Sequence, residues 1–241
     1  MVPAVALRKE SNFEPIGPLP SRGEVLARYR SLREISKVHH ARVLDFLSPS
    51  LVMQHARRLG LTDGKRLVLG SLDELTLAFD LAIHTAPVGR SRAIDRYARN
   101  APPPPGADEA LVLDAMRNAR FSVLSVEGRH QAAGLVLTDV FRDEEVWLVD
   151  EGLEISLPKR TLFATRYFTP DGFSMTAGAG MPVNPVFLAD AFESAPQLMR
   201  KPLMQAIGDP RFAEAIYRAA IADGMTERIT YQDPPGADDA A

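Results

Sequence analysis

The chain contains no cysteine among its 241 residues. It therefore has no disulfide, thiolate zinc site, iron–sulfur cluster or cysteine nucleophile, and a metal would need His and carboxylate ligands. No apolar run approaches the about 18 residues that a membrane span needs. The N-terminal charges follow a very short apolar run, which is the wrong order for a secretory signal. We expect a cytoplasmic protein with no membrane contact.

Charge is distributed unevenly along the chain, although the net charge is only −3. Residues 1–100 hold 16 Lys and Arg against 10 Asp and Glu, whereas residues 101–241 hold 12 against 21. The basic half could attract the acidic half, or it could face an acidic partner. The hydrophobic content of 46% is ample for the core of a globular protein.

One stretch of the sequence, residues 120–183, is typical of strands, whereas the chain on both sides has a helical period. Four short segments rich in Val, Leu, Phe, Tyr and Trp are separated by polar or Gly/Pro residues: 121–127, 134–141, 146–150 and 162–168. We predict an α+β protein with a small antiparallel β-barrel or meander between helical parts. Trp147 should pack inward within this β-module.

The prolines and the helical periodicity predict the domain organisation. The four prolines that precede Gly106 indicate an extended spacer, which we take as a boundary. The predicted units are a mobile arm (1–22), a helical domain (23–100), a Pro-rich linker (101–107), a β-module with a leading helix (108–183), C-terminal helices (184–225) and a tail (226–241).

Local signals place the individual helices. A long amphipathic helix should begin near Glu24, and Ser48-Pro49 should open a second helix that stops at Gly60. Residues 71–74 match a capping box, and the helix that follows is apolar nearly all round, which indicates burial. In the C-terminal part we predict helices over 186–192 and 198–207, and from Asp209-Pro210 to Gly224.

Asp80 and His84 are the best candidates for chemistry. Four residues apart on a helix, they share one face, so the carboxylate could orient the imidazole or both could ligate a metal. The sequence supplies no third ligand. A buried histidine bonded to a nearby carboxylate is also a common structural arrangement. We predict a buried structural pair, hydrogen-bonded to each other or to nearby backbone, with no metal and no cofactor, and keep catalysis as the alternative.

The remaining polar motifs favour structural roles. His39 lies on the apolar stripe of its helix, and His40 points about 100° away, so the two cannot chelate one ion. Four acidic residues could form a paired-carboxylate site, but their positions near strand ends favour turns: Asp139, Asp150, Glu151 and Glu154. Pro158 interrupts the S-x-x-K match at 156–159. The glycines at 178 and 180 indicate a bend.

One sequence pattern favours DNA binding. Residues 56–62 resemble the first helix and turn of a helix-turn-helix, but the following segment, 65–70, is short and apolar. Nucleic-acid affinity would be electrostatic and would need these basic side chains on one surface: Arg28, Arg30, Arg33, Arg57, Arg58, Arg92, Arg96 and Arg99.

Several short segments together are similar to a pattern found in uncharacterised bacterial proteins. They are residues 56–61, 80–84, 119–126, 138–139, 149–150 and 164–166. The resemblance spans about residues 45–183 and implies a helical N-terminal part followed by a small β-module. It implies no activity and no catalytic residue. Some of these proteins have a cysteine-rich zinc-binding tail, which this chain cannot form.

These observations favour a non-enzymatic module that binds a protein partner or regulates one. No segment combines a nucleophile, a base and an anion hole, and small barrels often act as adaptors. A metal-dependent or hydrolase-like enzyme using Asp80 and His84 is the second hypothesis. A nucleic-acid binder that uses the basic N-terminal half is the third.

Overall fold

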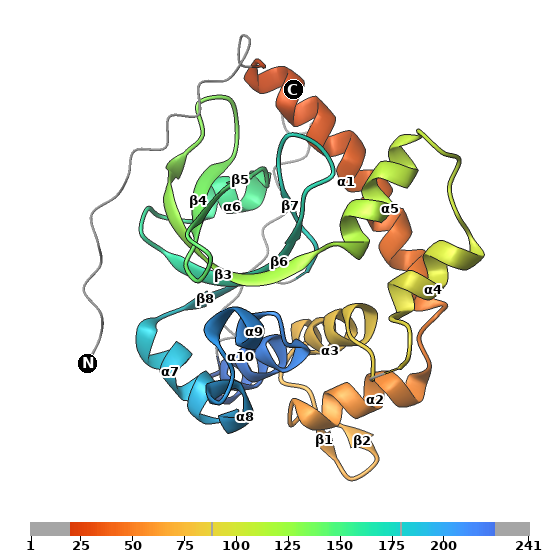
Figure 1. Ribbon diagram of the computed structural model, residues 1–241, viewed down its shortest axis with the longest axis vertical. Helices are drawn as coiled ribbons and strands as arrows, with labels where there is room; N and C mark the ends of the chain where they lie inside the picture. Colours follow the sequence, from red (N-terminus) through yellow and green to blue (C-terminus); the bar gives the residue numbers. More distant parts are fainter. Residues whose placement is uncertain (1–19, 88, 179, 225–241) are drawn as a thin grey trace, which may run out of the picture.

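The computed structural model describes residues 20–87, 89–178 and 180–224, and it shows a mixed α+β fold (Figure 1). Almost all of the predicted arm and the whole of the predicted tail lie outside these residues. The N-terminal part contains five helices and a small hairpin: α1 (Arg22–Leu44), α2 (Pro49–Arg58), β1 (Thr62–Asp63), β2 (Arg66–Leu67), α3 (Leu72–His84), α4 (Ala93–Asn100) and α5 (Asp108–Arg117).

Helix α1 begins where the polar side chains of its first turn satisfy the free backbone N–H groups. The hydroxyl of Ser21 accepts a hydrogen bond from the N–H of Glu24, and the carboxylate of Glu24 accepts one from the N–H of Ser21. Five of the six residues of the predicted stripe are buried on this helix, and Ser36 is buried with them: Val25, Tyr29, Leu32, His39 and Val43. The sixth, Phe46, lies beyond the end of the helix and is half-buried.

The capping box predicted for α3 is wrong. Ser71 occupies the N-cap position, but its side chain makes no capping hydrogen bond. The carboxylate of Glu74 instead accepts a hydrogen bond from the N–H of Gly70 at 2.7 Å. The predicted burial of this helix is correct, because Leu77, Ala78, Leu81 and Ala82 are almost inaccessible to solvent.

The β-module is a curled antiparallel sheet, as the sequence predicted. Its strands follow the order β5-β4-β3-β6-β7, and β8 also pairs with β6. A short helix, α6 (Glu151–Ser156), follows β5 and was not predicted. The strands are β3 (Arg120–Arg129), β4 (Leu135–Asp139), β5 (Glu144–Leu148), β6 (Leu162–Phe168), β7 (Met175–Thr176) and β8 (Met181–Val183).

The curl brings the edge strand β5 back towards β7. Leu148 forms an isolated parallel bridge with Ser174, just before β7 begins. Gly134 allows the β3–β4 turn to pass close to the end of β5, since its φ is +81° and a side chain there would overlap the carbonyl oxygen of Leu148. The sheet therefore closes at one end of β5, while the rest of this edge remains open.

The C-terminal helices pack beside α3 below the sheet (Figure 1). The helix predicted over 198–207 is interrupted, because Pro202 has no N–H group and its ring would clash with the preceding turn. The predicted stop at Gly224 is correct, and its φ is +66°. The helices are α7 (Pro185–Glu193), α8 (Pro196–Met199), α9 (Leu203–Ile207) and α10 (Pro210–Ala222).

Apolar clusters hold the three parts of the chain together. One cluster joins the outer face of β3 and β6 to α3, α7 and α10, and a second joins α1, α4 and α5 to residues around β7. A third fills the concave side of the sheet. Helix α5, which follows the proline run, packs against α1. The division into domains remains a prediction.

Gly134→Ala tests the close approach of the β3–β4 turn to the end of β5. We expect the variant to lose at least about 2 kcal/mol of unfolding free energy, since alanine is strained at a positive φ and its Cβ meets the Leu148 carbonyl. Gly128→Ala is the control, because nothing lies within 4 Å of a Cβ at that position. Urea denaturation of both variants decides the matter, and equal stabilities would contradict the described close approach of this turn to β5.

Candidate functional site

Asp80 is at the centre of a buried polar contact between three parts of the chain. Its two carboxylate oxygens accept hydrogen bonds from Nε and Nη2 of Arg166 on β6, at 2.8 and 3.0 Å. The hydroxyl of Tyr217 on α10 donates to Oδ2 of Asp80 at 2.8 Å. Asp80 is 5% exposed, Arg166 is 6% exposed and Tyr217 is inaccessible. Helix α3, strand β6 and helix α10 are thus joined through one carboxylate.

Burial and charge act on Asp80 in opposite directions. Removal from water disfavours the ionised carboxylate, but the positive charge and hydrogen bonds of Arg166, with a smaller contribution from the hydrogen bond of Tyr217, outweigh this cost. The pKa of Asp80 therefore lies below its usual value. Burial likewise disfavours the charged form of Arg166, but Asp80 more than compensates and raises the pKa of the guanidinium. The pair is ionised.

Aromatic and glycine residues surround the ion pair. Phe121 lies beside Arg166 in the sheet register, with the guanidinium 5.7 Å from its ring centroid. The same ring meets Tyr217 edge to face. On the other side, a Cβ at Gly178 would lie 3.2 Å from Oδ1 of Asp80, so a glycine suits this close approach.

His84 lies four residues from Asp80 but does not bond to it. The histidine is 6% exposed, and neither ring nitrogen has a hydrogen-bond partner among the described residues. The prediction that His84 is hydrogen-bonded to Asp80 or to nearby backbone is therefore wrong, and the carboxylate of Asp80 instead accepts from Arg166 and Tyr217. Burial, reinforced by the charge of Arg166, places the pKa of His84 well below its usual range, so the imidazole is neutral.

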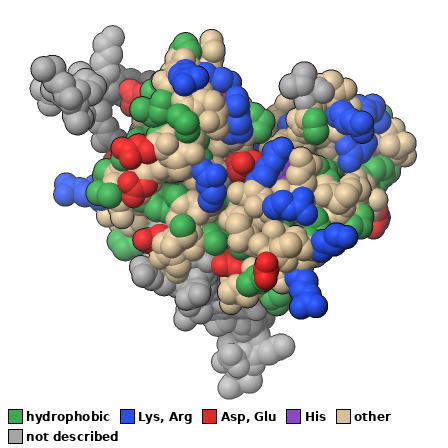
Figure 2. All heavy atoms as spheres, turned by 90° about the horizontal axis from the view of Figure 1, so that it is seen from below, with side chains coloured by type: hydrophobic (Ala, Val, Ile, Leu, Met, Phe, Trp, Pro, Cys, Tyr) green, Lys and Arg blue, Asp and Glu red, His purple; other side chains and the backbone are tan. Residues whose placement is uncertain are grey.

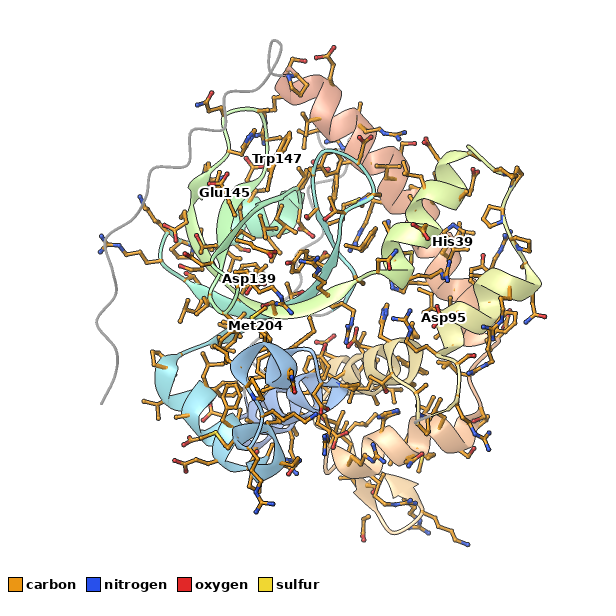
Figure 3. All side chains as sticks on the ribbon, in the orientation of Figure 1. His39, Asp95, Asp139, Glu145, Trp147 and Met204 are labelled. Atoms are coloured by element: carbon orange, nitrogen blue, oxygen red, sulfur yellow. The ribbon has the colours of Figure 1, made fainter. Side chains whose placement is uncertain are left out.

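His39 is a packed core residue, as its position on the stripe predicted. It is 2% exposed and lies between α1, α4 and α5 (Figure 3). Its Nε2 donates to the carbonyl of Glu109 at 2.9 Å, so its Nδ1 accepts from the hydroxyl of Tyr97 at 2.8 Å. His40 is half-buried, and burial lowers its pKa.

Each of the four acidic candidates near the strand ends has its own structural partners. Oδ1 of Asp139 accepts from the N–H groups of Phe141 and Arg142, which confirms the predicted turn. Asp150 caps α6 and also accepts from Thr176. The other two form ion pairs with the N-terminal helix: Glu151 with Arg30, and Glu154 with Arg22.

The other motifs do not combine into a site. Ser156 is the last residue of α6, and the helix ends before Lys159. In the described part of the chain, no three His, Asp or Glu residues are placed to hold a metal ion. None of its helices is long and apolar enough to cross a membrane.

The second helix of a helix-turn-helix is not formed, because β1 and β2 make a hairpin immediately after the turn at Gly60. Several of the basic side chains are held by carboxylates, most of them in the acidic half of the chain. Arg28 binds Asp108 and Asp171, and Arg92 binds Asp95. The basic and acidic halves therefore attract each other in the folded protein.

A large groove, which the sequence did not predict, lies on the β-module. Its volume is about 1190 Å³, and it separates strand β5 from α5 and the β6–β7 connection. Trp147 lies on its wall and is half-buried, not fully packed inward (Figure 3). The indole stacks on His130 at a centroid distance of 4.0 Å, and its Nε1 donates to the carbonyl of Ala133 at 2.7 Å.

The fold defines a helical protein built around a curled sheet, with a buried ion pair at the junction and an open groove on the sheet. The model of a family of unknown function, DUF7986, matches residues 24–219. The chain belongs to this family. Comparisons with curated proteins and with solved structures give no match.

His84→Leu tests whether the buried imidazole has only a structural role. At neutral pH we expect the unfolding free energy to be unchanged or raised by up to about 1 kcal/mol, since leucine removes two unsatisfied nitrogens. A loss of more than about 2 kcal/mol would show that the imidazole has a partner and would revive the catalytic alternative.

The unfolding free energy of His84→Leu should depend less on pH below neutrality than that of the wild-type protein. Below about pH 6.5 His84 binds a proton in the unfolded chain but not in the folded protein. The unfolding free energy therefore decreases as the pH is lowered, by up to about 1.4 kcal/mol per pH unit. Removing the histidine removes this contribution. Denaturation at about pH 7 and pH 5 measures the effect. His84→Gln should also flatten the profile, but it keeps a buried polar group and should be less stable than His84→Leu.

Proposed function

We propose that the protein is a non-enzymatic binding module that holds an extended segment of another protein in the groove beside β5. The observation that carries this proposal is the open edge of β5, which lies along a groove with an aromatic wall. Extended peptides commonly bind by adding a strand to such an edge. A cytoplasmic location remains a prediction.

The hydrogen bonds of β5 indicate which peptide groups are available. The carbonyl of Trp147 accepts from the N–H of Ser174 at 2.7 Å, so the peptide groups of Trp147 point away from β4. This orientation alternates along an antiparallel strand, so Glu145 also directs its N–H and carbonyl towards the open edge. Two main-chain hydrogen bonds are thus available to a bound strand.

The side chains around this edge suggest a basic segment. Glu144 is held by Arg120 at 3.0 Å, but the neighbouring Glu145 is exposed and has no ion pair among the described residues. A Lys or Arg two residues from an apolar side chain could therefore pair with Glu145 while that side chain contacts Trp147 or Phe173. The edge is short, so these side-chain contacts must supply most of the affinity.

The buried pair supports binding over catalysis. A catalytic group must reach its substrate, whereas Asp80 is 5% exposed and already accepts three hydrogen bonds. Use of Asp80 as a base would require loss of the contacts to both Arg166 and Tyr217. Binding of a peptide in the groove requires no loss of these buried contacts.

A displayed library of random peptides tests the proposal. We expect the purified protein to enrich peptides with a basic residue two positions from an apolar or aromatic residue, and Glu145→Lys should weaken them at least about tenfold. Glu193→Lys makes the same charge change on an exposed position of α7 outside the groove, and it should leave binding unchanged. No enrichment, or equal losses in the two variants, would contradict this function.

A further inference from the structure

His130 connects the turn between β3 and β4 to the wall of the groove. Its ring stacks on the indole of Trp147, with 4.0 Å between the centroids and 20° between the planes. The indole Nε1 donates to the carbonyl of Ala133 in the same turn, at 2.7 Å. The position of Trp147 on the groove wall therefore depends on this turn and on the imidazole.

The hydrogen bonds of the turn fix the protonation state of the imidazole. The N–H of Ala132 donates to Nδ1 of His130 at 3.2 Å, so Nδ1 holds a lone pair and the neutral ring carries its proton on Nε2. A second proton can be added only at Nδ1, where it removes the acceptor of Ala132. Because Ala132 is 6% exposed, loss of this acceptor destabilises the present conformation of the turn.

His130 is placed to exchange protons with the solvent in the folded protein. It is half-buried, and of the five histidines of the chain, all of which the structure describes, it alone lines the groove. Burial lowers its pKa, and the negative charge of Glu145 acts in the opposite direction. The ring is therefore neutral at pH 7 and becomes charged in acid.

Glu145 supplies the negative charge that acts on His130. The other charged residues that line the groove lie close to partners of opposite charge: Arg120 to Glu144, Arg129 to Glu154, and Asp114 to Arg117. Glu145 lies with Trp147 in the upper part of the molecule, whereas Lys and Arg side chains gather on part of the face seen from below (Figures 2 and 3). A positive charge on His130 would thus be added next to the carboxylate that is available to a ligand.

We propose that protonation of His130 lowers the affinity of the groove for a basic segment. The proton on Nδ1 releases the N–H of Ala132 and loosens the turn that holds the indole of Trp147. The imidazolium also competes with a lysine or arginine of the bound segment for Glu145. The effect on binding rests on the proposed function, whereas the change at Trp147 requires no ligand.

The fluorescence of Trp147, the only tryptophan of the chain, tests the change without a ligand. An imidazolium quenches a stacked indole more strongly than a neutral imidazole does. We expect the emission to fall on acidification, with a midpoint below about pH 6.5, while far-ultraviolet circular dichroism shows that the protein stays folded. Constant emission from about pH 8 to pH 5 in the folded protein would overturn the proposal.

Three variants assign the transition to His130. His130→Phe keeps a ring beside Trp147, and His130→Asn keeps a side-chain acceptor for the N–H of Ala132, but neither can bind the proton. We expect both to lose the transition, whereas His40→Asn, at a half-buried position outside the groove, should keep it. Melting curves are recorded first, and His130→Asn decides alone if the Phe variant does not fold. A transition that persists without His130 would refute its role.

A blocked peptide that carries one lysine two positions from one leucine, with threonine elsewhere, measures the effect on binding. We expect its affinity for the wild-type protein to fall at least about twofold between about pH 7.5 and pH 5, and to change less for His130→Asn. Equal affinities at both pH values would contradict the effect on binding. Absence of binding at either pH, together with the fluorescence transition, would contradict the proposed function and leave the change at Trp147 confirmed.

Discussion

The ionised contact between Asp80 and Arg166 is the constraint on which the arrangement of the molecule depends. A charge on α3 and a charge on β6 are both removed from water, and each is tolerated only because the other is present. Tyr217 adds a hydrogen bond from α10. The helical N-terminal part, the sheet and the C-terminal helices must therefore assemble in one relative position for the polar groups to be satisfied.

This arrangement leaves the groove beside β5 outside the buried centre. The groove lies where the curled sheet closes at one end of β5 only. Surface ion pairs such as those of Arg28 and Arg30 join the basic and acidic halves, but exposed pairs contribute little individually. Packing and the buried pair carry most of the specificity of the fold.

Much of the fold follows from local patterns in the sequence. The stripe of α1, the Ser48-Pro49 start of α2 and the strands of the β-module all agree with periodicity and turn chemistry. The failures have local causes too. Glu74 bonds the backbone of Gly70 instead of completing a capping box with Ser71, and Pro202 divides a helix whose apolar spacing continues across it.

The candidate sites were harder to predict because they depend on long-range contacts. Asp80 drew attention as a charge in an apolar helix, and Arg166 is equally a charge in an apolar strand, but 86 residues separate them. Each is a charged residue in an otherwise apolar segment, and this feature of the sequence could have predicted that the two form a pair. The groove depends on how far the sheet curls, and the buried contact depends on how α3 and β6 meet. Neither can be read from spacing.

A double-mutant cycle on Asp80 and Arg166 tests the central claim most directly. Asp80→Leu and Arg166→Met each leave one buried charge without its partner, so each should cost about 3–5 kcal/mol of unfolding free energy. The double variant buries no charge and should be more stable than either single variant, with a coupling energy of at least about 2 kcal/mol. Single effects that add to within about 0.5 kcal/mol would show that the two charges do not depend on each other, and would contradict this account.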